Sequence, residues 1–498
     1  MPTSCANDAF SASRARFEQV CCFMGGEEAS GLTHGELEAR LTIDVRDVVR
    51  QLYQDHLDLR AVREERLGEV VDAEGTGRGS VEAGHVRPLQ TIFGDVGVTR
   101  LAYRHRGEDN LYPADAALNL PTELHSHGLR QLSAIESARG SFAEATEAVR
   151  RATGVTLGKR QVEQLAARSA VDFEAFYENP SRVKANQGDV LVLSADGKGI
   201  VMRPDALRPA TAKAAGKATA KLKTRLSKGE KRNRKRMAEV GAVYDVTPVV
   251  RTPTDIIGRD DDADRTPAPK ATNKWLTASV ADDAAAVISS IFEEAQRRDP
   301  QNQRTWVALV DGAKHQIDCI NAEAKARQVE VSIVCDFIHV LEYLWSAAWS
   351  FFTEGDQAAE AWVADKALAV LQGDASTVAA SIRRKATCLG LDPRARENAD
   401  RCADYLLAKR DYLNYPRALE QGWPIATGVI EGACRHLVKD RLDLTGSRWG
   451  LNGAEAILKL RALRSNADFD EYWRFHLDRE RHRVHEARYA HGLIPTAA

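Results

Sequence analysis

The 498-residue sequence has neither a long hydrophobic run nor a cysteine framework. No apolar stretch approaches the ~18 residues that a membrane-spanning helix needs. The opening residues, MPTSCANDAF, lack the basic and apolar regions of a secretory signal. The eight cysteines include no Cys-x-x-Cys pair, which argues against a disulfide scaffold and against a zinc ribbon. We therefore expect a cytoplasmic protein with several domains, reduced thiols and no membrane partner.

The sequence also has almost no net charge, because opposite charges cancel along the chain. The formal net charge is −2, yet twelve Lys or Arg residues lie between Arg208 and Arg236 with the single acidic residue Glu230. This segment therefore has a local charge of +11, and the rest of the chain has −13. Its few large apolar residues predict an exposed arm that binds nucleic-acid phosphates, with a solubilising loop as the alternative. The candidate DNA contacts in it are Lys221, Lys223, Arg225, Lys231, Arg232, Arg234, Lys235 and Arg236.

The first third of the chain predicts helices and one β-hairpin. Apolar residues at helical spacing predict a helix over residues 33–68, and the alternating pattern around Gly94 to Gly97 predicts a hairpin. Three short helices follow within residues 126–173, broken at glycines, in the outline of a helix-turn-helix. The third helix begins near Lys159 and Arg160, which would face DNA; a purely structural helical bundle is the alternative.

From residue 189 the pattern becomes that of an α/β fold. We expect a short strand, an Asp-Gly-Lys-Gly turn and a returning strand in residues 189–203, and after them a third strand at 238–250. The expected elements that follow are a helix at 282–298, a strand at 305–312, a helix at 313–328, a strand at 329–336, an entirely helical stretch at 337–420 and a helix at 428–440. Three strands in a meander, then helix, strand, helix and strand, is the order of the ribonuclease-H-like fold.

Three carboxylates are candidates for a metal site. Asp196 and Asp311 each follow an apolar run and precede a glycine, which lets a metal or phosphate approach the backbone. They fall on the first and fourth strands of the predicted sheet, which are neighbours in that fold, so we expect them to converge. Glu431, on the helix at 428–440, is the third candidate. Three hard oxygen ligands suit Mg²⁺, which retains waters and shares its shell with substrate phosphates.

Five motifs in this order resemble those of the ISKra-type bacterial insertion-sequence transposases, which are DDE recombinases related to Mutator-like elements. The motifs are SADGKGIVMR, VALVDGAKHQI, CDFIHVLEYLW, TGVIEGACRHLVKDR and TGSRWGLNGAEAILKLRAL. The likeness extends upstream to TIFGDVGVTRLAYR, so it covers roughly residues 85–490. The resemblance implies that Asp196, Asp311 and Glu431 form the catalytic triad and that Asp336-x-x-His339 is the element after the fifth strand.

The resemblance also implies the cofactors and partners. Two Mg²⁺ ions, for which Mn²⁺ can substitute, would support cleavage and joining of double-stranded DNA at the terminal inverted repeats of the element and at a target. A dimer or larger homo-oligomer associated with the nucleoid is expected. His339 would contact the scissile phosphate or orient a ligand, or else only pair with Asp336. Trp449 would stack on DNA or be buried against a helix at 453–464. The candidate phosphate contacts near the triad are Lys198, Arg435, His436, Lys439, Arg441 and Arg448.

The predicted fold class is a multidomain protein with an α/β catalytic core of ribonuclease-H-like fold. The expected divisions are an N-terminal helical region (1–80), a β-hairpin unit (81–125), a helix-turn-helix-like domain (126–180), a core in two parts (187–336 and 425–475) with the basic insert 208–236, an all-α insertion (337–424) and a basic tail (476–498) that is solvated or faces DNA. Two other functions stay open: a nuclease or resolvase that cleaves without strand transfer, and a domesticated DNA-binding regulator.

Overall fold

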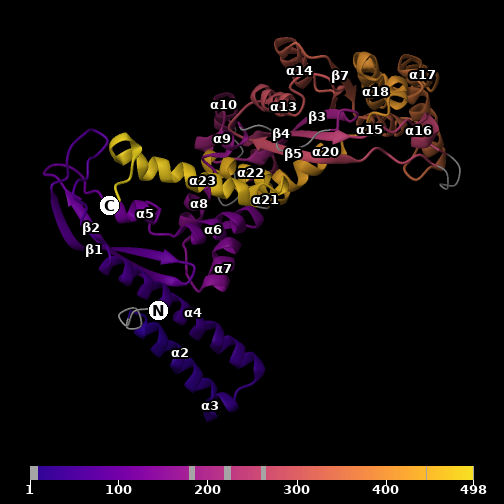
Figure 1. The fold of residues 1–498 in the computed structure, drawn as a ribbon. Helices are drawn as coiled ribbons and strands as arrows, with labels where there is room; N and C mark the ends of the chain where they lie inside the picture. The colour runs from indigo at the N-terminus through magenta and orange to yellow at the C-terminus, as the bar shows by residue number, and fades with distance from the viewer. Residues whose placement is uncertain (1–8, 179–185, 218–225, 259–264, 445, 497–498) are drawn as a thin grey trace. The chain divides into compact units, whose positions relative to one another are not determined.

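A computed structural model of the chain describes residues 9–178, 186–217, 226–258, 265–444 and 446–496. The fold is mixed α/β, with one two-stranded and one five-stranded sheet. The chain forms two compact units, Met1–Phe176 with Asp468–Ala498, and Tyr177–Ala467 (Figure 1). Every helix in the described ranges is too short or too polar to cross a membrane.

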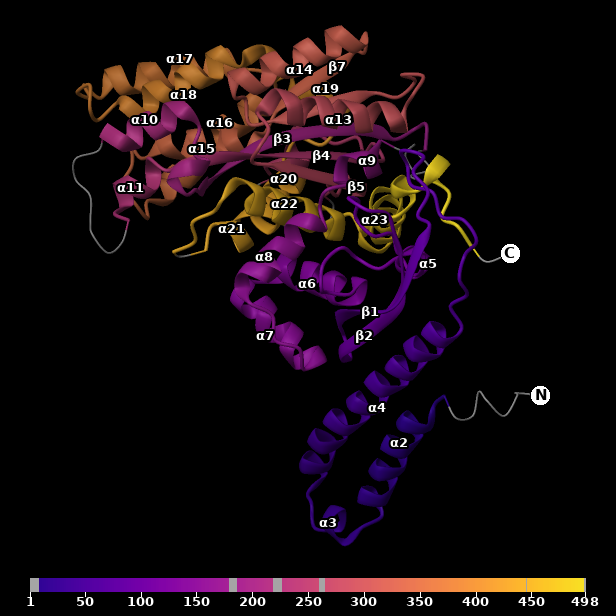
Figure 2. The ribbon, with the colours of Figure 1, turned by 90° about the vertical axis from the view of Figure 1, so that its left-hand side faces the viewer.

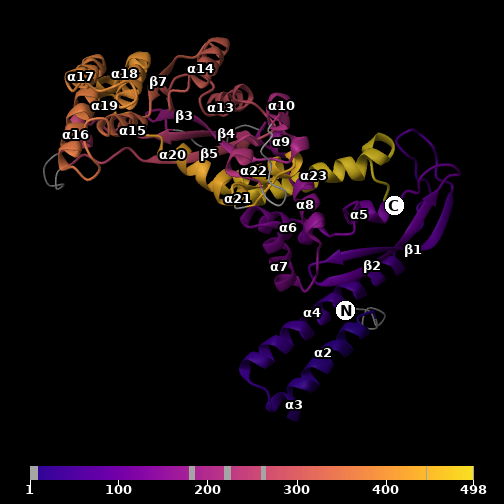
Figure 3. The same ribbon diagram turned by 180° about the vertical axis from the view of Figure 1, so that it is seen from behind.

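The first unit begins with a helical hairpin. Helix α2 (Ser11–Met24) leads through the short α3 (Glu27–Ser30) into α4 (His34–Val62), and α2 lies along α4 (Figure 3). Thr33 and Glu36 form the capping box at the start of α4: the threonine side chain accepts from the Glu36 amide, and the glutamate accepts from the Thr33 amide. The helix predicted from residue 33 is confirmed, although it ends at residue 62.

The second element of this unit is the predicted β-hairpin. Strands β1 (Ser80–Thr91) and β2 (Gly94–Arg104) pair in antiparallel fashion. Thr91 pairs with Gly94, so the chain reverses at residues 92–93, just before the glycine-containing turn that the sequence pattern indicated. The hairpin itself is confirmed, and the short α5 (Pro113–Ala117) follows it.

Three helices then pack around one small core, as predicted. They are α6 (His127–Arg139), α7 (Phe142–Thr153) and α8 (Lys159–Arg168). Leu129, Val149 and Leu165, one from each helix, meet in this core. Gly154 ends α7 in the left-handed conformation at φ 76°, which a residue with a side chain seldom adopts. A short helix, α9 (Phe173–Tyr177), leads toward the second unit.

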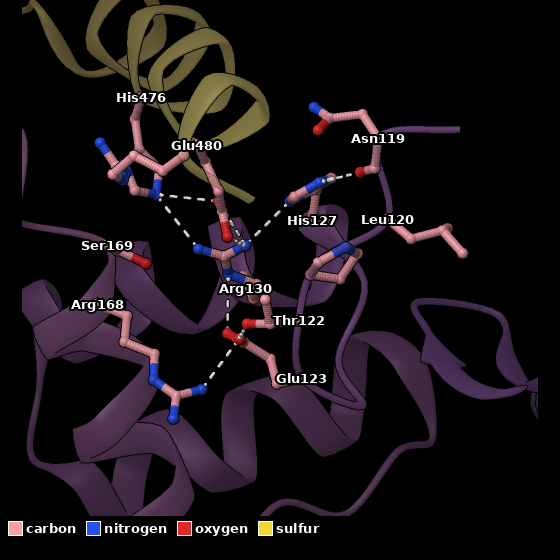
Figure 4. A network of polar contacts seen from close by, with 12 residues as sticks. Asn119, Leu120, Thr122, Glu123, His127, Arg130, Arg168, Ser169, His476 and Glu480 are labelled. Atoms are coloured by element: carbon pink, nitrogen blue, oxygen red, sulfur yellow. Dashed lines mark hydrogen bonds and ion pairs between the residues drawn. The ribbon is translucent and has the colours of Figure 1, made fainter. Parts of the chain in front are cut away.

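Helix α23 (Phe469–Val484) belongs to the first unit although it lies near the end of the sequence. Its side chains His476 and Glu480 are buried, and Glu480 accepts hydrogen bonds of 2.8 and 2.7 Å from Arg130 of α6 (Figure 4). A solvated or DNA-facing tail was predicted from residue 476. This is corrected for His476 and Glu480, because both side chains are buried and bonded to other residues of the first unit. The boundary expected at residue 475 falls inside this helix.

The second unit is built on the five-stranded sheet. Its strands are β3 (Val190–Val201), β4 (Lys235–Val246), β5 (Ala271–Ser279), β6 (Trp306–Val310) and β7 (Val331–Cys335). Their order across the sheet is β5-β4-β3-β6-β7. Strands β3, β4 and β5 form an antiparallel meander, whereas β6 and β7 are parallel to β3. The predicted adjacency of the strands that contain Asp196 and precede Asp311 is therefore confirmed.

The first part of the meander differs from the prediction. Residues 190–201 form one continuous strand, with Asp196 in its middle, instead of two strands joined by an Asp-Gly-Lys-Gly turn. Gly197 pairs with Glu239 and Gly199 with Met237 in the ladder with β4. The missing third strand of the meander is β5, which the sequence pattern did not indicate. The basic segment consequently lies between the first two strands of the sheet.

Helices cover both faces of this sheet. On one face lie α13 (Ala284–Arg298) and α14 (Lys314–Arg327), and their Ile291 and Ile317 pack on Leu193 and Ala308 of the sheet. The opposite face holds α20 (Gly428–Ala433), a π-helical stretch, η4 (Cys434–Lys439), the short α21 (Asp440–Leu442) and α22 (Leu451–Ser465). Figures 1 and 2 both show the sheet between these two layers.

The stretch between β7 and α20 is all-helical, as predicted. It contains α15 (Phe337–Ala348), α16 (Gln357–Leu371), α17 (Ala375–Cys388), α18 (Glu397–Ala408) and α19 (Tyr415–Glu420). The connection from β3 to β4 holds α10 (Pro209–Lys217) and α11 (Lys228–Arg232), and α12 (Pro253–Ile256) follows β4.

Candidate metal centre

Three aspartates lie level with one another across the parallel strands. Leu193 of β3 pairs with Ala308 of β6, and continuing that register three residues places Asp196 level with Asp311. Val310 of β6 pairs with Cys335 of β7, so Asp311 is in turn level with Asp336. Residues that are level on neighbouring parallel strands point to the same face. That face is opposite to α13 and α14, and α20 and η4 cover it.

Asp196 contacts the covering helix directly. Its Oδ2 accepts a hydrogen bond of 3.2 Å from the thiol of Cys434, and its Oδ1 accepts one of 2.6 Å from the amide of Gly197. Burial and the neighbouring Asp196 carboxylate raise the pKa of the Cys434 thiol far above its ordinary value. Cys434 is therefore a protonated donor that connects η4 to the central strand.

Asp311 lies in a tight turn after β6. Its Oδ1 accepts a hydrogen bond of 2.8 Å from the amide of Ala313, while Gly312 between them has a φ of 94°. The turn thus holds one carboxylate oxygen. Because Asp311 is only half-buried, its side chain still reaches solvent. This arrangement presents a fixed carboxylate at the end of a buried strand.

Asp336 is fully buried at the start of α15 and connects that helix to α20. Its Oδ1 accepts from the amides of Ile338, at 2.9 Å, and Thr427, at 3.3 Å, and its Oδ2 accepts from the hydroxyl of Thr427. Thr427 immediately precedes α20. Asp336 therefore fixes the start of the helix that contains Glu431, a role that the sequence alone did not show.

Asp336, His339 and Glu431 form a group that can hold a metal ion. One ligand atom from each lies within 4.8 Å of the others. His339 Nδ1 is 3.5 Å from Asp336 Oδ2, and this ion pair raises the pKa of His339 to about 9 although burial opposes the shift. A metal ion bound to this imidazole would have to displace its proton.

The donor chemistry of Asp336, His339 and Glu431 fits a divalent cation. The carboxylate oxygens suit Mg²⁺ or Mn²⁺, the imidazole also suits transition metals such as Zn²⁺, and the nearby thiol is protonated. Glu431 is exposed, and within the described ranges its carboxylate makes no hydrogen bond or ion pair, so it is available as a ligand. Of the predicted triad, only Glu431 belongs to the group within 4.8 Å. Asp196 and Asp311 are not members of that group, although their strands, β3 and β6, are neighbours in the sheet.

Several predicted phosphate contacts are exposed. Lys159 and Arg160 occupy the first turn of α8, with their side chains at the surface of the first unit. In the second unit the exposed side chains are those of Arg435, Lys439 and Arg448, while Lys198 and His436 are half-buried. Arg435, Lys439 and Glu431 are all exposed along one continuous helical stretch, which supports the expectation that they share a face.

Two other predicted DNA contacts are corrected, and for Trp449 the stated alternative of burial is confirmed. Trp449 is only 5% exposed, and its Nε1 donates a hydrogen bond of 3.0 Å to the carbonyl of Leu442. Arg441 is also buried, with its guanidinium 4.7 Å from the centre of the Trp449 ring. Neither side chain can reach DNA in this fold, because each is covered by neighbouring parts of the second unit.

The basic segment is only partly available to DNA. Arg236 donates hydrogen bonds to the carbonyls of Val280 and Ala281, so its predicted role as a phosphate contact is corrected. Arg234 forms an ion pair with Glu230 at 4.0 Å. Lys235 is exposed and Lys231 is half-buried. Lys221, Lys223 and Arg225 lie outside the described residues, as does the side chain of Arg232.

A scan of the sequence against protein-family models gives no match, and a search among curated proteins gives none either.

Proposed function

We propose that this protein is a DDE transposase that binds the ends of a DNA element and catalyses metal-dependent strand cleavage and strand transfer. The observation that carries the proposal is the row of Asp196, Asp311 and Asp336 across three parallel strands, with Glu431 beside it. Carboxylates gathered at one sheet edge are the donor set that phosphoryl transfer with divalent ions needs.

The strand order supports a ribonuclease-H-like core. An antiparallel meander of three strands, with two further parallel strands added beside the first, is the arrangement that this fold has, and the order β5-β4-β3-β6-β7 is consistent with it. The all-α stretch 337–424 would then be an insertion between the fifth strand and the helix that contains the last acidic residue.

Each side chain of the centre has a proposed role. Asp196, Asp311 and Glu431 would hold two Mg²⁺ ions, which supply Lewis acidity for in-line displacement at a DNA phosphate. Asp336 holds the start of α20 and the ring of His339. His339, positively charged when no metal is bound to it, would donate to the scissile phosphate.

The first unit supports DNA binding. Its three-helix bundle places Lys159 and Arg160 at the exposed N-terminus of α8, where a recognition helix presents side chains to base edges and phosphates. The proposed substrates are the terminal inverted repeats and a target duplex. Because two ends must be joined, we expect a dimer or larger assembly.

A cleavage assay tests this proposal. The substrate is a labelled duplex made from inverted repeats that flank the coding region, incubated with a target plasmid and Mg²⁺. Asp311→Ala and Glu431→Ala should abolish cleavage and leave DNA binding intact, whereas Asp318→Ala, at an exposed position of α14, should leave both unchanged. Near-normal cleavage by either of the first two variants would refute the assignment. Products that are cut but never joined to the plasmid would favour the nuclease alternative.

A further inference from the structure

The all-helical stretch 337–424 contacts the backbone of the candidate metal centre through a tyrosine. Tyr405, on α18, donates a hydrogen bond of 3.1 Å from its hydroxyl to the carbonyl oxygen of Asp311. The phenol is thus bonded to the same residue whose carboxylate faces the covering helix. A group on the inserted helices therefore determines how the peptide plane after Asp311 is oriented.

The turn at Gly312, next to the Tyr405 hydroxyl, is closely packed. Gly312 has a φ of 94°, and a Cβ atom added to it would lie 3.3 Å from the Tyr405 hydroxyl and 3.2 Å from Cys335 Sγ. A glycine can adopt several backbone conformations, so the peptide between Asp311 and Gly312 could rotate. The hydrogen bond from Tyr405 to the Asp311 carbonyl restricts that rotation. The contact with Tyr405 thus fixes a turn that glycine alone would leave adjustable.

A second tyrosine does the same at the neighbouring strand. Tyr415, which begins α19, is fully buried and donates a hydrogen bond of 2.9 Å to the carbonyl of Cys335, the residue before Asp336. Its ring packs edge-on against Phe337, the residue after Asp336, with ring centroids 5.3 Å apart. Two hydroxyl groups from the inserted helices therefore reach the ends of two adjacent parallel strands.

The Tyr405 side chain is itself held in place. Its ring stacks on that of Tyr343, on α15, with centroids 4.1 Å apart and planes inclined by 16°. A stacked ring has little rotational freedom, so its hydroxyl is directed at the Asp311 carbonyl before any ligand binds. In the described ranges the Tyr343 hydroxyl makes no hydrogen bond, so the two phenols share one stack and differ in this contact.

We propose that Tyr405 and Tyr415 are positioning residues, through which the inserted helices set two carboxylates of the proposed metal centre: that of Asp311, a proposed ligand, and that of Asp336, which holds His339 and the start of α20. The inference rests on the proposed function, because it assumes that these carboxylates form a metal centre. Carboxylates that bind two ions must be placed to within about 0.5 Å. The helical insertion is on this view a scaffold for the centre, independent of any contact that it makes with DNA.

The test compares Tyr405→Phe with Tyr343→Phe in the full-length protein. Each change removes one hydroxyl from the same stacked pair of rings, but only the first removes the hydrogen bond to Asp311. Mn²⁺ binding is measured by the electron paramagnetic resonance signal of the free ion, and thermal unfolding is measured in parallel. We expect Tyr405→Phe to weaken Mn²⁺ binding by about three- to tenfold, as the loss of one hydrogen bond implies. Tyr343→Phe should stay within about twofold of wild type.

Cleavage provides the second readout. Tyr405→Phe should cleave poorly at limiting Mg²⁺ and approach the wild-type rate at saturating Mg²⁺, and Tyr415→Phe should behave in the same way. Equal Mn²⁺ affinity for wild type and Tyr405→Phe, with only the unfolding temperature lowered, would show a merely structural tyrosine and overturn the inference. A wild-type protein that binds no Mn²⁺ would overturn the proposed function as well, so the two failures are distinguishable.

Discussion

Replacing Arg130 with methionine should destabilise the first unit more than any surface substitution on the same helix. The Arg130 side chain is 1% exposed. One terminal nitrogen, Nη1, donates to both carboxylate oxygens of Glu480, and Nε lies 3.3 Å from Oε1 of Glu123 (Figure 4). The other, Nη2, is 3.2 Å from Nε2 of His476. A single positive charge thus joins α6 to α23 and neutralises two buried carboxylates.

The magnitude follows from what the substitution leaves behind. Methionine keeps the unbranched aliphatic chain and a similar helix propensity, so the main change is loss of the charge. Removing one partner of a buried ion pair typically costs about 3–5 kcal/mol. Glu123 retains an ion pair with Arg168 at 3.0 Å, and Glu480 retains His476 at 3.6 Å, so we expect a value near the lower limit, about 3 kcal/mol.

The assay is amide hydrogen exchange of α6 and α23 at increasing urea, followed by mass spectrometry, which reports the free energy of unfolding of the first unit alone. Arg139→Met is the matched control, because Arg139 lies on the same helix and its ion pair with Glu136 is at the surface. That pair should contribute no more than about 0.5 kcal/mol. The reasoning would be refuted if both variants lowered the free energy of unfolding equally, or if Arg130→Met lowered it by less than about 1 kcal/mol.

Other single substitutions test the remaining contacts. Arg160→Ala should reduce the slope of log DNA affinity against log salt concentration by about 1, because one phosphate contact is lost; an unchanged slope would exclude a contact there. Gly312→Ala should destabilise the second unit by about 1–2 kcal/mol in urea denaturation, since alanine is strained at a φ of 94°, and wild-type stability would contradict this. Although burial alone raises it, hydrogen bonds from His476 and Arg483 hold the pKa of Asp172 at about 2. A pKa below the unfolded value means that this carboxylate stabilises the fold above about pH 4 and loses that effect as the pH falls toward 2. Asp172→Asn should therefore flatten the dependence of stability on pH in this range, and parallel curves for the two proteins would show that the pKa is not depressed.

The parts of the fold that could be predicted depend on local signals. The capping boxes at Thr33 and Ser141 mark the starts of α4 and α7, because the side chain that caps the N-terminus of each helix lies three residues from its partner in the sequence. A third helix after Gly154 was also predictable, although α8 spans only Lys159–Arg168, less than the expected residues 157–173. In the candidate site, the adjacency of the strands that contain Asp196 and precede Asp311 followed from the order of strands alone.

The parts that could not be predicted depend on contacts between distant residues. Asp196-Gly197 has the composition of a turn, but pairing along the whole of β4 keeps residues 190–201 extended. Nothing near Arg236 shows that carbonyls some 45 residues later will accept its hydrogen bonds. Burial of Trp449 is one of the two outcomes expected from the sequence, but its bond to the carbonyl of Leu442 and its contact with the buried Arg441 could not be predicted from local signals.

The helix that contains Glu431 is bonded near both ends to the row of aspartates on the sheet. Thr427 bonds to Asp336 at the end of β7, and Cys434 bonds to Asp196 on β3. Seven residues of helix rise about 10.5 Å, and two inter-strand spacings measure about 9.6 Å, so the helix matches the distance between these two strands. Glu431 lies on this helix four residues after Thr427, and one of its carboxylate oxygens is within 4.8 Å of ligand atoms of Asp336 and His339. The triad predicted from the sequence includes Asp196, Asp311 and this glutamate, and the structure adds Asp336, whose carboxylate bonds to Thr427 at the start of the helix.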